Sequence, residues 1–128
     1  MSGGAANLVL ERSLDTLWQR GRVSLENIAN ATTPGYKRKI VGFENELKTA
    51  LLSLNEGATP RERLEIVGQI SPQVFTDRST TMNVDGNNVD VDQEYVEMLR
   101  TTEQFQYVQR LLNDNYARLR YAITEGKS

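Results

Sequence analysis

The feature that most constrains this chain is an apolar stripe near its C-terminal end. Apolar residues return there at alternating steps of four and three, the period of an α-helix and close to that of a coiled-coil seam. Asp90 can cap such a helix and Gln93 can complete a capping box. The pattern predicts a helix from about Asp90 to Thr124, roughly 50 Å long at 1.5 Å per residue. The stripe comprises Val91, Tyr95, Met98, Thr102, Phe105, Gln109, Leu112, Tyr116, Leu119 and Ile123.

A second stripe of the same period lies near the N-terminal end and predicts a helix from about Asn7 to Asn30. Gly21 lies within it at a cost of up to about 1 kcal/mol, which indicates close packing against another backbone or a local bend. We expect the two helices to pair, in either antiparallel or parallel orientation. A pair still leaves apolar faces exposed, so we infer that copies of the chain or other subunits complete the core. This stripe comprises Leu10, Leu14, Leu17, Gly21, Leu25 and Ile28.

The middle of the chain lacks a long periodic pattern. Residues 43–54 can form a short helix, and residues 55–63 are polar and interrupted by glycine and proline. Residues 65–75 are predicted to form one or two short strands. Residues 76–88 are polar, and we expect them to be mobile.

The predicted fold class is therefore mainly α, with long N- and C-terminal helices paired as a coiled-coil core domain and a short irregular or small β middle segment. Residues 1–35 would hold the first helix and the turn after it. Residues 36–88 would form the middle segment, and residues 89–128 the second helix of the core.

Composition excludes much of enzyme chemistry. The 128 residues contain neither cysteine nor histidine, which removes disulfides, thiolate metal sites and the usual general base. A formal net charge of −2 provides no strong field for nucleic acid or anionic lipid. No apolar run approaches the roughly 20 residues of a membrane span, and no secretory leader is recognisable. We expect no enzyme activity, no cofactor and no small-molecule substrate.

Two clusters leave minor alternatives open. Residues 81–92 faintly resemble a calcium loop, but position one is Thr81 and position twelve is Asp92 rather than Glu, so a capped turn is the better interpretation. The carboxylates of Asp85, Asp90 and Asp92 are the only cluster worth testing for catalysis, and nothing places an acid–base partner beside them. No metal site is predicted.

The basic run 37–39 is a single small cluster on an acidic protein, which is weak evidence for nucleic-acid binding. A solvated turn, or pairing with acidic residues of a neighbouring subunit, explains the cluster better.

The most specific segment is residues 27–37, a helix end with two asparagines followed by a Thr-Pro-Gly turn, an aromatic residue and a lysine. Proline and glycine at the second and third turn positions suit a type II turn. A helix-terminating turn alone would account for it. The residues that carry the motif are Asn27, Ala29, Asn30, Thr33, Pro34, Gly35 and Tyr36.

This segment resembles the N-terminal signature of the bacterial flagellar axial proteins, which are the rod, hook and hook-associated subunits. Three further features resemble the short proximal rod subunits of that family. Residues 43–47 match a Phe-x-x-x-Leu pattern after the turn, and residues 85–92 precede the last helix. The chain also lacks the large inserted domain of hook and distal rod subunits.

The resemblance implies a structural subunit that polymerises helically into a hollow shaft, which links a membrane ring to the distal rod and transmits torque. It implies partners: further copies of the chain, the rod proteins FlgC, FlgF and FlgG, the rod–ring adaptor FliE, the membrane ring protein and the flagellar type III export gate. It also implies a periplasmic rod in the basal body, reached by export from the cytoplasm without a cleaved signal peptide. The sister proximal rod protein FlgC and a soluble coiled-coil adaptor or export chaperone remain alternatives.

The residues expected to mediate helix pairing and subunit packing are the large members of the two stripes. They are Leu10, Leu14, Leu17, Leu25, Ile28, Tyr95, Met98, Phe105, Leu112, Tyr116 and Leu119.

Overall fold

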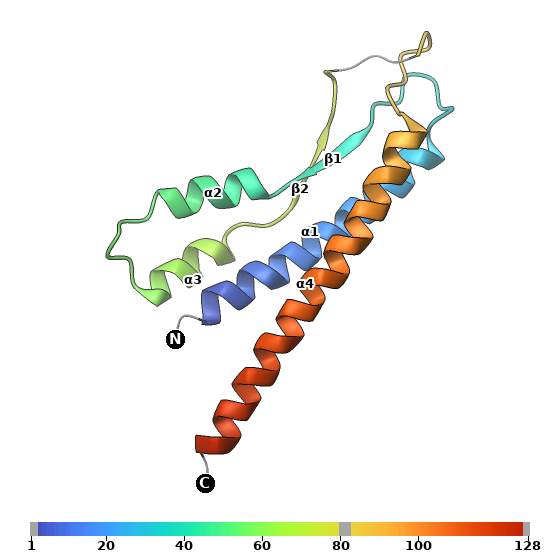
Figure 1. Cartoon of the computed structure of the whole chain (residues 1–128). Coiled ribbons are helices and arrows are strands. Elements are labelled where there is room, and N and C mark those ends of the chain that lie inside the picture. Colours follow the sequence, from blue (N-terminus) through green and yellow to red (C-terminus); the bar gives the residue numbers. More distant parts are fainter. Residues whose placement is uncertain (1–2, 80–82, 127–128) are drawn as a thin grey trace.

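The computed structural model describes residues 3–79 and 83–126 and is dominated by two long helices. Helix α1 spans Gly3–Ala29 and helix α4 spans Val91–Gly126. The two pack side by side and antiparallel (Figure 1), because Asn27 contacts Glu94 at one end while Asn7 contacts Asn115 toward the other. The predicted fold class is confirmed, and of the two orientations left open the chain adopts the antiparallel one.

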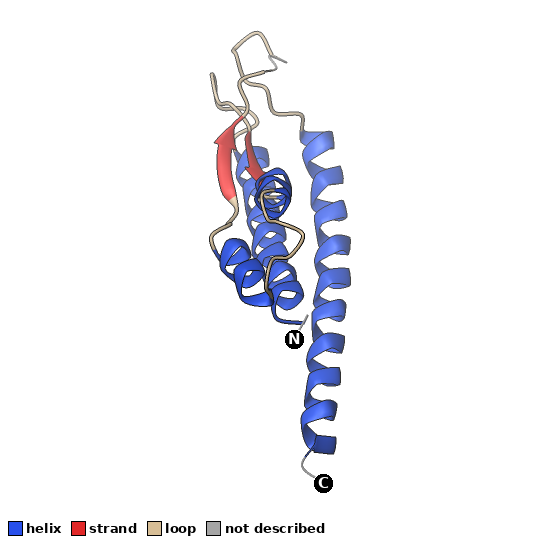
Figure 2. Ribbon diagram, turned by 90° about the vertical axis from the view of Figure 1, so that its left-hand side faces the viewer, coloured by secondary structure: helices blue, strands red, loops and turns tan. Residues whose placement is uncertain are grey.

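The middle segment forms a small unit of two helices and two strands on α1. Strand β1 (Lys39–Gly42) leads into α2 (Glu44–Leu52), and α3 (Pro60–Gly68) leads into β2 (Gln73–Thr76). The strands are antiparallel, with Val41 opposite Val74. Figures 1 and 2 show this unit on one side of α1 and α4 on the other, so α1 is the central layer.

The core is small and lies where α1 contacts its neighbours. Its buried apolar residues come from both long helices, the first strand and α3, and Phe43 after β1 is almost fully buried. Gly42 permits close approach of the two strands, because a Cβ there would lie 2.9 Å from Cε2 of Phe75. The buried apolar residues are Leu17, Val23, Val41, Phe43, Val67, Val89 and Leu112.

The middle segment differs from the prediction in two places. Residues 65–68, expected as strand, belong to α3, and β1 was not predicted. The helix forms because Thr59 and Glu62 make a capping box around Pro60, with the Thr59 hydroxyl accepting from the Glu62 amide at 3.2 Å. The strand prediction is confirmed only for the end of the range, in β2.

The segment before α4 is more ordered than expected. Asn87 and Asn88 are buried, and Asp77 is half-buried, so the expectation of a mobile segment is wrong for these positions. Residues 80–82 lie outside the described part. The predicted cap of α4 is confirmed, because the Asp90 carboxylate accepts the Gln93 amide at 3.2 Å. No helix among the described residues is long and apolar enough to cross a membrane.

Candidate functional site

The best-defined polar site lies where α1 ends and α4 begins, and its centre is Asn27. This side chain is fully buried and makes four hydrogen bonds. Its Oδ1 accepts from the Lys39 amide at 2.9 Å and from the Tyr36 hydroxyl at 3.0 Å. Its Nδ2 donates to the Lys39 carbonyl at 2.9 Å and to the Glu94 carboxylate at 3.2 Å. One side chain thus ties α1 to the turn, to β1 and to α4.

The turn after α1 is closed by Asn30 and Gly35. Asn30 Nδ2 donates to the Glu26 carbonyl at 2.9 Å, and its Oδ1 accepts from the Thr33 hydroxyl at 3.2 Å. Gly35 has a φ of 75°, in the left-handed region that favours glycine. Its amide donates to the Asp85 carbonyl at 3.0 Å, so the turn is held by the loop before α4.

That loop packs directly on the turn through Asn87. The Asn87 Nδ2 group donates to the carbonyls of Asn30 and Thr33 at 2.9 and 2.8 Å. Its Oδ1 accepts the Val89 amide at 2.8 Å, and its own amide donates to the Asp85 carboxylate at 3.1 Å. Two motifs more than 50 residues apart in sequence therefore form one structure.

An ionic cluster completes the site. The guanidinium of Arg38 donates to Glu94, which is 2% exposed, at 3.0 Å and to Asp77 at 3.1 Å. Asn88 Oδ1 accepts the Arg38 amide at 2.6 Å, and Asn88 Nδ2 donates to the Asp77 carbonyl at 2.7 Å. Hydrogen bonds from Ser79 and then from Arg38 lower the pKa of Asp77. We call the six side chains of Asn27, Tyr36, Arg38, Asn87, Asn88 and Glu94 the joint.

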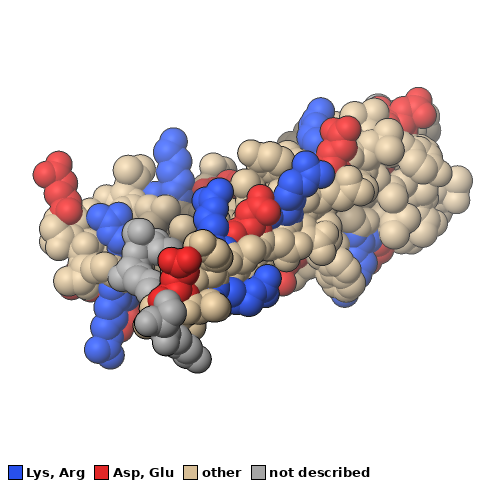
Figure 3. All heavy atoms as spheres, turned by 60° about the horizontal axis from the view of Figure 1, so that its bottom comes forward, with Lys and Arg blue, Asp and Glu red and all other residues tan. Residues whose placement is uncertain are grey.

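The basic run is part of this architecture. Lys37 donates to the Gly86 carbonyl, and Lys39 pairs with Glu26 at 2.7 Å. Burial, followed by the charge of Glu26, raises the pKa of Tyr36. All three basic side chains have partners within the chain. In the face shown in Figure 3, basic and acidic side chains are interspersed, which gives no single-signed surface there for nucleic acid.

Two of the carboxylates considered for calcium binding or catalysis, those of Asp85 and Asp90, accept hydrogen bonds from backbone amides. Asp85 accepts the Asn87 amide, and Asp90 caps α4. Positions 81 and 82 of the candidate calcium loop lie outside the described residues. Elsewhere in the described ranges, no group of three acidic residues could hold a metal ion.

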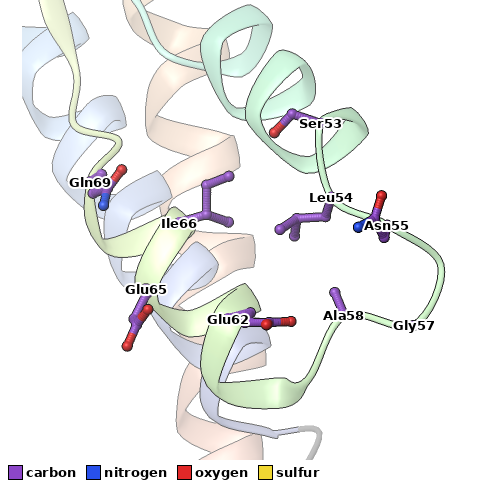
Figure 4. A pocket seen from close by; sticks show the side chains of 9 residues that line it. All are labelled: Ser53, Leu54, Asn55, Gly57, Ala58, Glu62, Glu65, Ile66 and Gln69. Atoms are coloured by element: carbon purple, nitrogen blue, oxygen red, sulfur yellow. The ribbon is translucent and has the colours of Figure 1, made fainter.

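A hollow of about 580 Å³ lies between α2 and α3 (Figure 4). The side chains of Leu54 and Ile66 face one another across it. Its two carboxylates are engaged, because Glu62 accepts the Thr59 amide at 2.8 Å and Glu65 pairs with Arg61 at 3.4 Å. Both are local helix contacts rather than a catalytic pair.

The predicted signature residues separate into inward and outward positions. Asn27 is buried and Ala29, Thr33, Pro34 and Gly35 are exposed, while Asn30 and Tyr36 are half-buried. Of the joint, only Asn27 and Tyr36 were predicted. Asn87 and Asn88 lie in the segment 85–92 before the last helix, and their contacts with residues 30, 33, 38 and 77 were not predicted.

The predicted packing residues also divide. Leu17 and Leu112 are buried between the long helices, whereas Leu25, Tyr95 and Leu119 are exposed. The half-buried members are Leu10, Leu14, Ile28, Met98, Phe105 and Tyr116.

Comparison with known proteins agrees with this architecture. The chain is 30% identical over 119 residues to the flagellar basal body rod protein FlgB of Bacillus subtilis, covering 92% of each chain. It is 38% identical over 93 residues to the protein of that name from Borreliella burgdorferi, covering 65% of this chain and 69% of the relative. For the Escherichia coli protein of that name the identity is 30% over 106 residues, covering 75% and 76%. No family model matches the chain.

The chain is an antiparallel helix pair with a polar joint, and its relatives are flagellar rod proteins. Together these findings define a structural protein of the bacterial flagellar axis. The chain belongs to the FlgB family of flagellar basal body rod proteins. It is accordingly a structural subunit of the basal body rod.

Proposed function

We propose that the chain polymerises with other rod proteins into the hollow proximal rod, which links the membrane ring to the distal rod, transmits torque and encloses the export channel. The observation that carries this proposal is the exposed apolar surface of the α1–α4 pair. Trp18 is 59% exposed, Leu99 70% and Tyr107 62%. Large apolar side chains left open on helices with coiled-coil spacing are typical of surfaces that an assembly covers.

The predicted packing residues take two roles in this proposal. Leu17 and Leu112, buried between the helices, hold the pair together within one subunit. Leu25 and Tyr95, which are 55% and 54% exposed, form contacts between subunits. The exposed part of the signature turn, including Pro34, lies at a subunit junction.

The partners are further copies of the chain, the rod proteins FlgC, FlgF and FlgG, the adaptor FliE, the membrane ring protein and the type III export gate. The rod lies in the periplasm, and the subunit reaches it from the cytoplasm through the export gate without a cleaved signal peptide. Assembly requires no chemical step, and the proposal includes neither cofactor nor metal, nucleic acid nor small-molecule substrate.

Electron cryotomography of basal bodies in a strain deleted for this gene tests the proposal. We expect the membrane ring and export apparatus to be present and the rod to be missing. Re-expression of the chain should restore the rod. A complete rod in the deletion strain would contradict the proposal and favour a soluble coiled-coil adaptor or export chaperone.

A further inference from the structure

Gly21 lies in the middle of α1, and no contact among residues 3–79 and 83–126 explains a glycine there. The helix continues through this position without a break. A Cβ built at Gly21 would meet no atom within 4 Å. Glycine is among the least favourable residues in a helix interior, and here the chain gains no internal packing from it. The empty space above Gly21 is therefore the first sign of a contact with another molecule.

Gly21 also lines a groove between the two long helices. The groove has a volume of about 500 Å³ and runs along Leu17, Trp18, Gly21 and Leu25 of α1, facing Thr102 and Phe105 of α4. The guanidinium of Arg22, which also lines the groove, lies 5.6 Å from the centroid of the Trp18 ring. Because Gly21 carries no side chain, a helix lying in this groove can approach the backbone of α1 closely.

The end of α4 in the same chain carries exposed apolar side chains beyond the start of α1 (Figure 1). Helix α4 runs past the start of α1 (Figure 1). In this overhang, residues 117–126, Leu119 is 37% exposed and Ile123 53%. Leu119 lies seven residues after the buried Leu112 and therefore on the same face of α4. This is the face with which the preceding part of α4 packs on α1. The overhang is thus an extension of an interface whose natural partner is a helix surface of the α1–α4 type.

The overhang cannot reach the groove of its own molecule. Phe105 in the groove and Ile123 in the overhang lie on one continuous helix, roughly 27 Å apart at 1.5 Å per residue. The groove extends along about two turns of α1, from Leu17 to Leu25, whereas Leu119 and Ile123 of the overhang lie about one turn apart. The two apolar side chains therefore fit within the length of the groove, but only in that of a different molecule.

We propose that the overhang of one subunit, through Leu119 and Ile123, docks in the Gly21 groove of a second copy of this chain. This inference rests on the proposed function and adds the contact that joins successive subunits. The groove and the overhang are different surfaces, so the contact is heterologous. After each subunit is added, one groove remains open at one end of the series and one overhang at the other. Such a contact gives an open series of subunits rather than a closed dimer.

Disulfide cross-linking tests the contact directly, because the chain contains no cysteine. The double variant Thr102→Cys, Ile123→Cys is expressed in the deletion strain, and isolated basal bodies are oxidised and separated on a non-reducing gel. We expect dimers and longer multimers of this chain, because the two positions meet within the few ångströms that a disulfide requires. The matched control Glu103→Cys, Ile123→Cys moves the first cysteine to the outward face of α4 and should remain monomeric.

Three outcomes overturn the inference: no cross-link beyond that of the control, a series that stops at the dimer, or a product whose second member is another rod protein. If the chain is present in basal bodies yet fails to cross-link, only the docking contact is wrong. If the chain is absent from basal bodies, the proposed function itself fails, and the inference fails with it.

A second variant tests the groove without cysteines. Gly21→Leu should leave the helix content and melting temperature of the isolated chain undiminished, because the added side chain enters open space and leucine favours helix. Motility should be lost, because the groove is filled. The control Gly57→Leu makes the same change at another glycine with no atom near its Cβ, away from the groove, and should swim normally. Normal swimming of Gly21→Leu would refute the docking contact.

Discussion

The fully buried Asn27 side chain gives the sharpest test of the joint. Asn27→Ala removes four hydrogen bonds, those with the Tyr36 hydroxyl, the amide and carbonyl of Lys39, and the Glu94 carboxylate. A hydrogen bond contributes about 0.5–1.5 kcal/mol net, and a buried group left without a partner costs about 1–3 kcal/mol. Tyr36 and Lys39 are only half-buried, so water can replace part of what is lost there.

We therefore expect Asn27→Ala to lower the free energy of unfolding by about 3–5 kcal/mol. For a chain of this length that corresponds to a fall of about 10–20 °C in melting temperature. Urea and thermal unfolding of the isolated chain, followed by circular dichroism, measure both. The control Asn113→Ala changes an exposed residue of α4 and should cost less than about 0.5 kcal/mol. If Asn27→Ala and the control unfold within about 1 kcal/mol of each other, the joint does not stabilise the fold.

Three further predictions concern the turn, the helix interface and pH. Gly35→Ala should lower stability by about 1 kcal/mol, because φ is 75° there, and urea unfolding measures it. Leu112→Asp, which buries an unpaired carboxylate between the helices, should abolish rod assembly and motility, and normal swimming would contradict this. The hydrogen bond from Arg20 lowers the pKa of Glu44 below 4.5, so its contribution to stability is present above that value and is lost as pH falls through the lowered pKa. Glu44→Gln should therefore lose less stability than the parent chain below pH 4.5, as acid titrations of both would measure.

The two long helices could be predicted because their signal is local and repeated. Steps of three and four residues over many turns define a helix without any knowledge of its partner, and they located α1 and α4 to within a few residues. The sequence gives no comparable local signal for whether the two helices run parallel or antiparallel. The orientation of the pair depends on which end of α4 meets the turn, and only contacts such as Asn27–Glu94 settle it.

The prediction for the middle segment was wrong at α3 and β1 for a different reason. Thr59, Pro60 and Glu62 form a complete helix start, but glycine and proline nearby were given more weight than the capping pattern. Strand β1 is only four residues long and pairs with β2 more than 30 positions later. Short strands of this kind are specified by their partner and by the helix they cover, so their own sequence identifies them weakly.

Only part of the joint could be predicted from the sequence. Asn27 and Tyr36 belong to the predicted turn motif, yet Glu94, which accepts one of the four hydrogen bonds of Asn27, lies 67 residues further along the chain. The Asn87–Asn88 pair resembled an ordinary turn before a capped helix. Nothing in the sequence states that the Asn87 side-chain amide donates to the backbone of a turn 54 and 57 residues earlier, or that the Asn88 amide donates to the carbonyl of Asp77.

The contrast between a polar joint and apolar helices has a consequence for assembly. Stripes that repeat every three and four residues can slide by one heptad and still place apolar side chains opposite one another, so they specify the stagger of α1 and α4 weakly. A buried polar contact has no such freedom, because a slip of α4 breaks the Asn27–Glu94 hydrogen bond and takes the buried Glu94 carboxylate away from Arg38. The stagger in turn sets how far α4 extends beyond α1, and a slip of one heptad would change that overhang by about 10 Å. The joint at one end of the hairpin therefore fixes the surface that the other end presents to the next subunit.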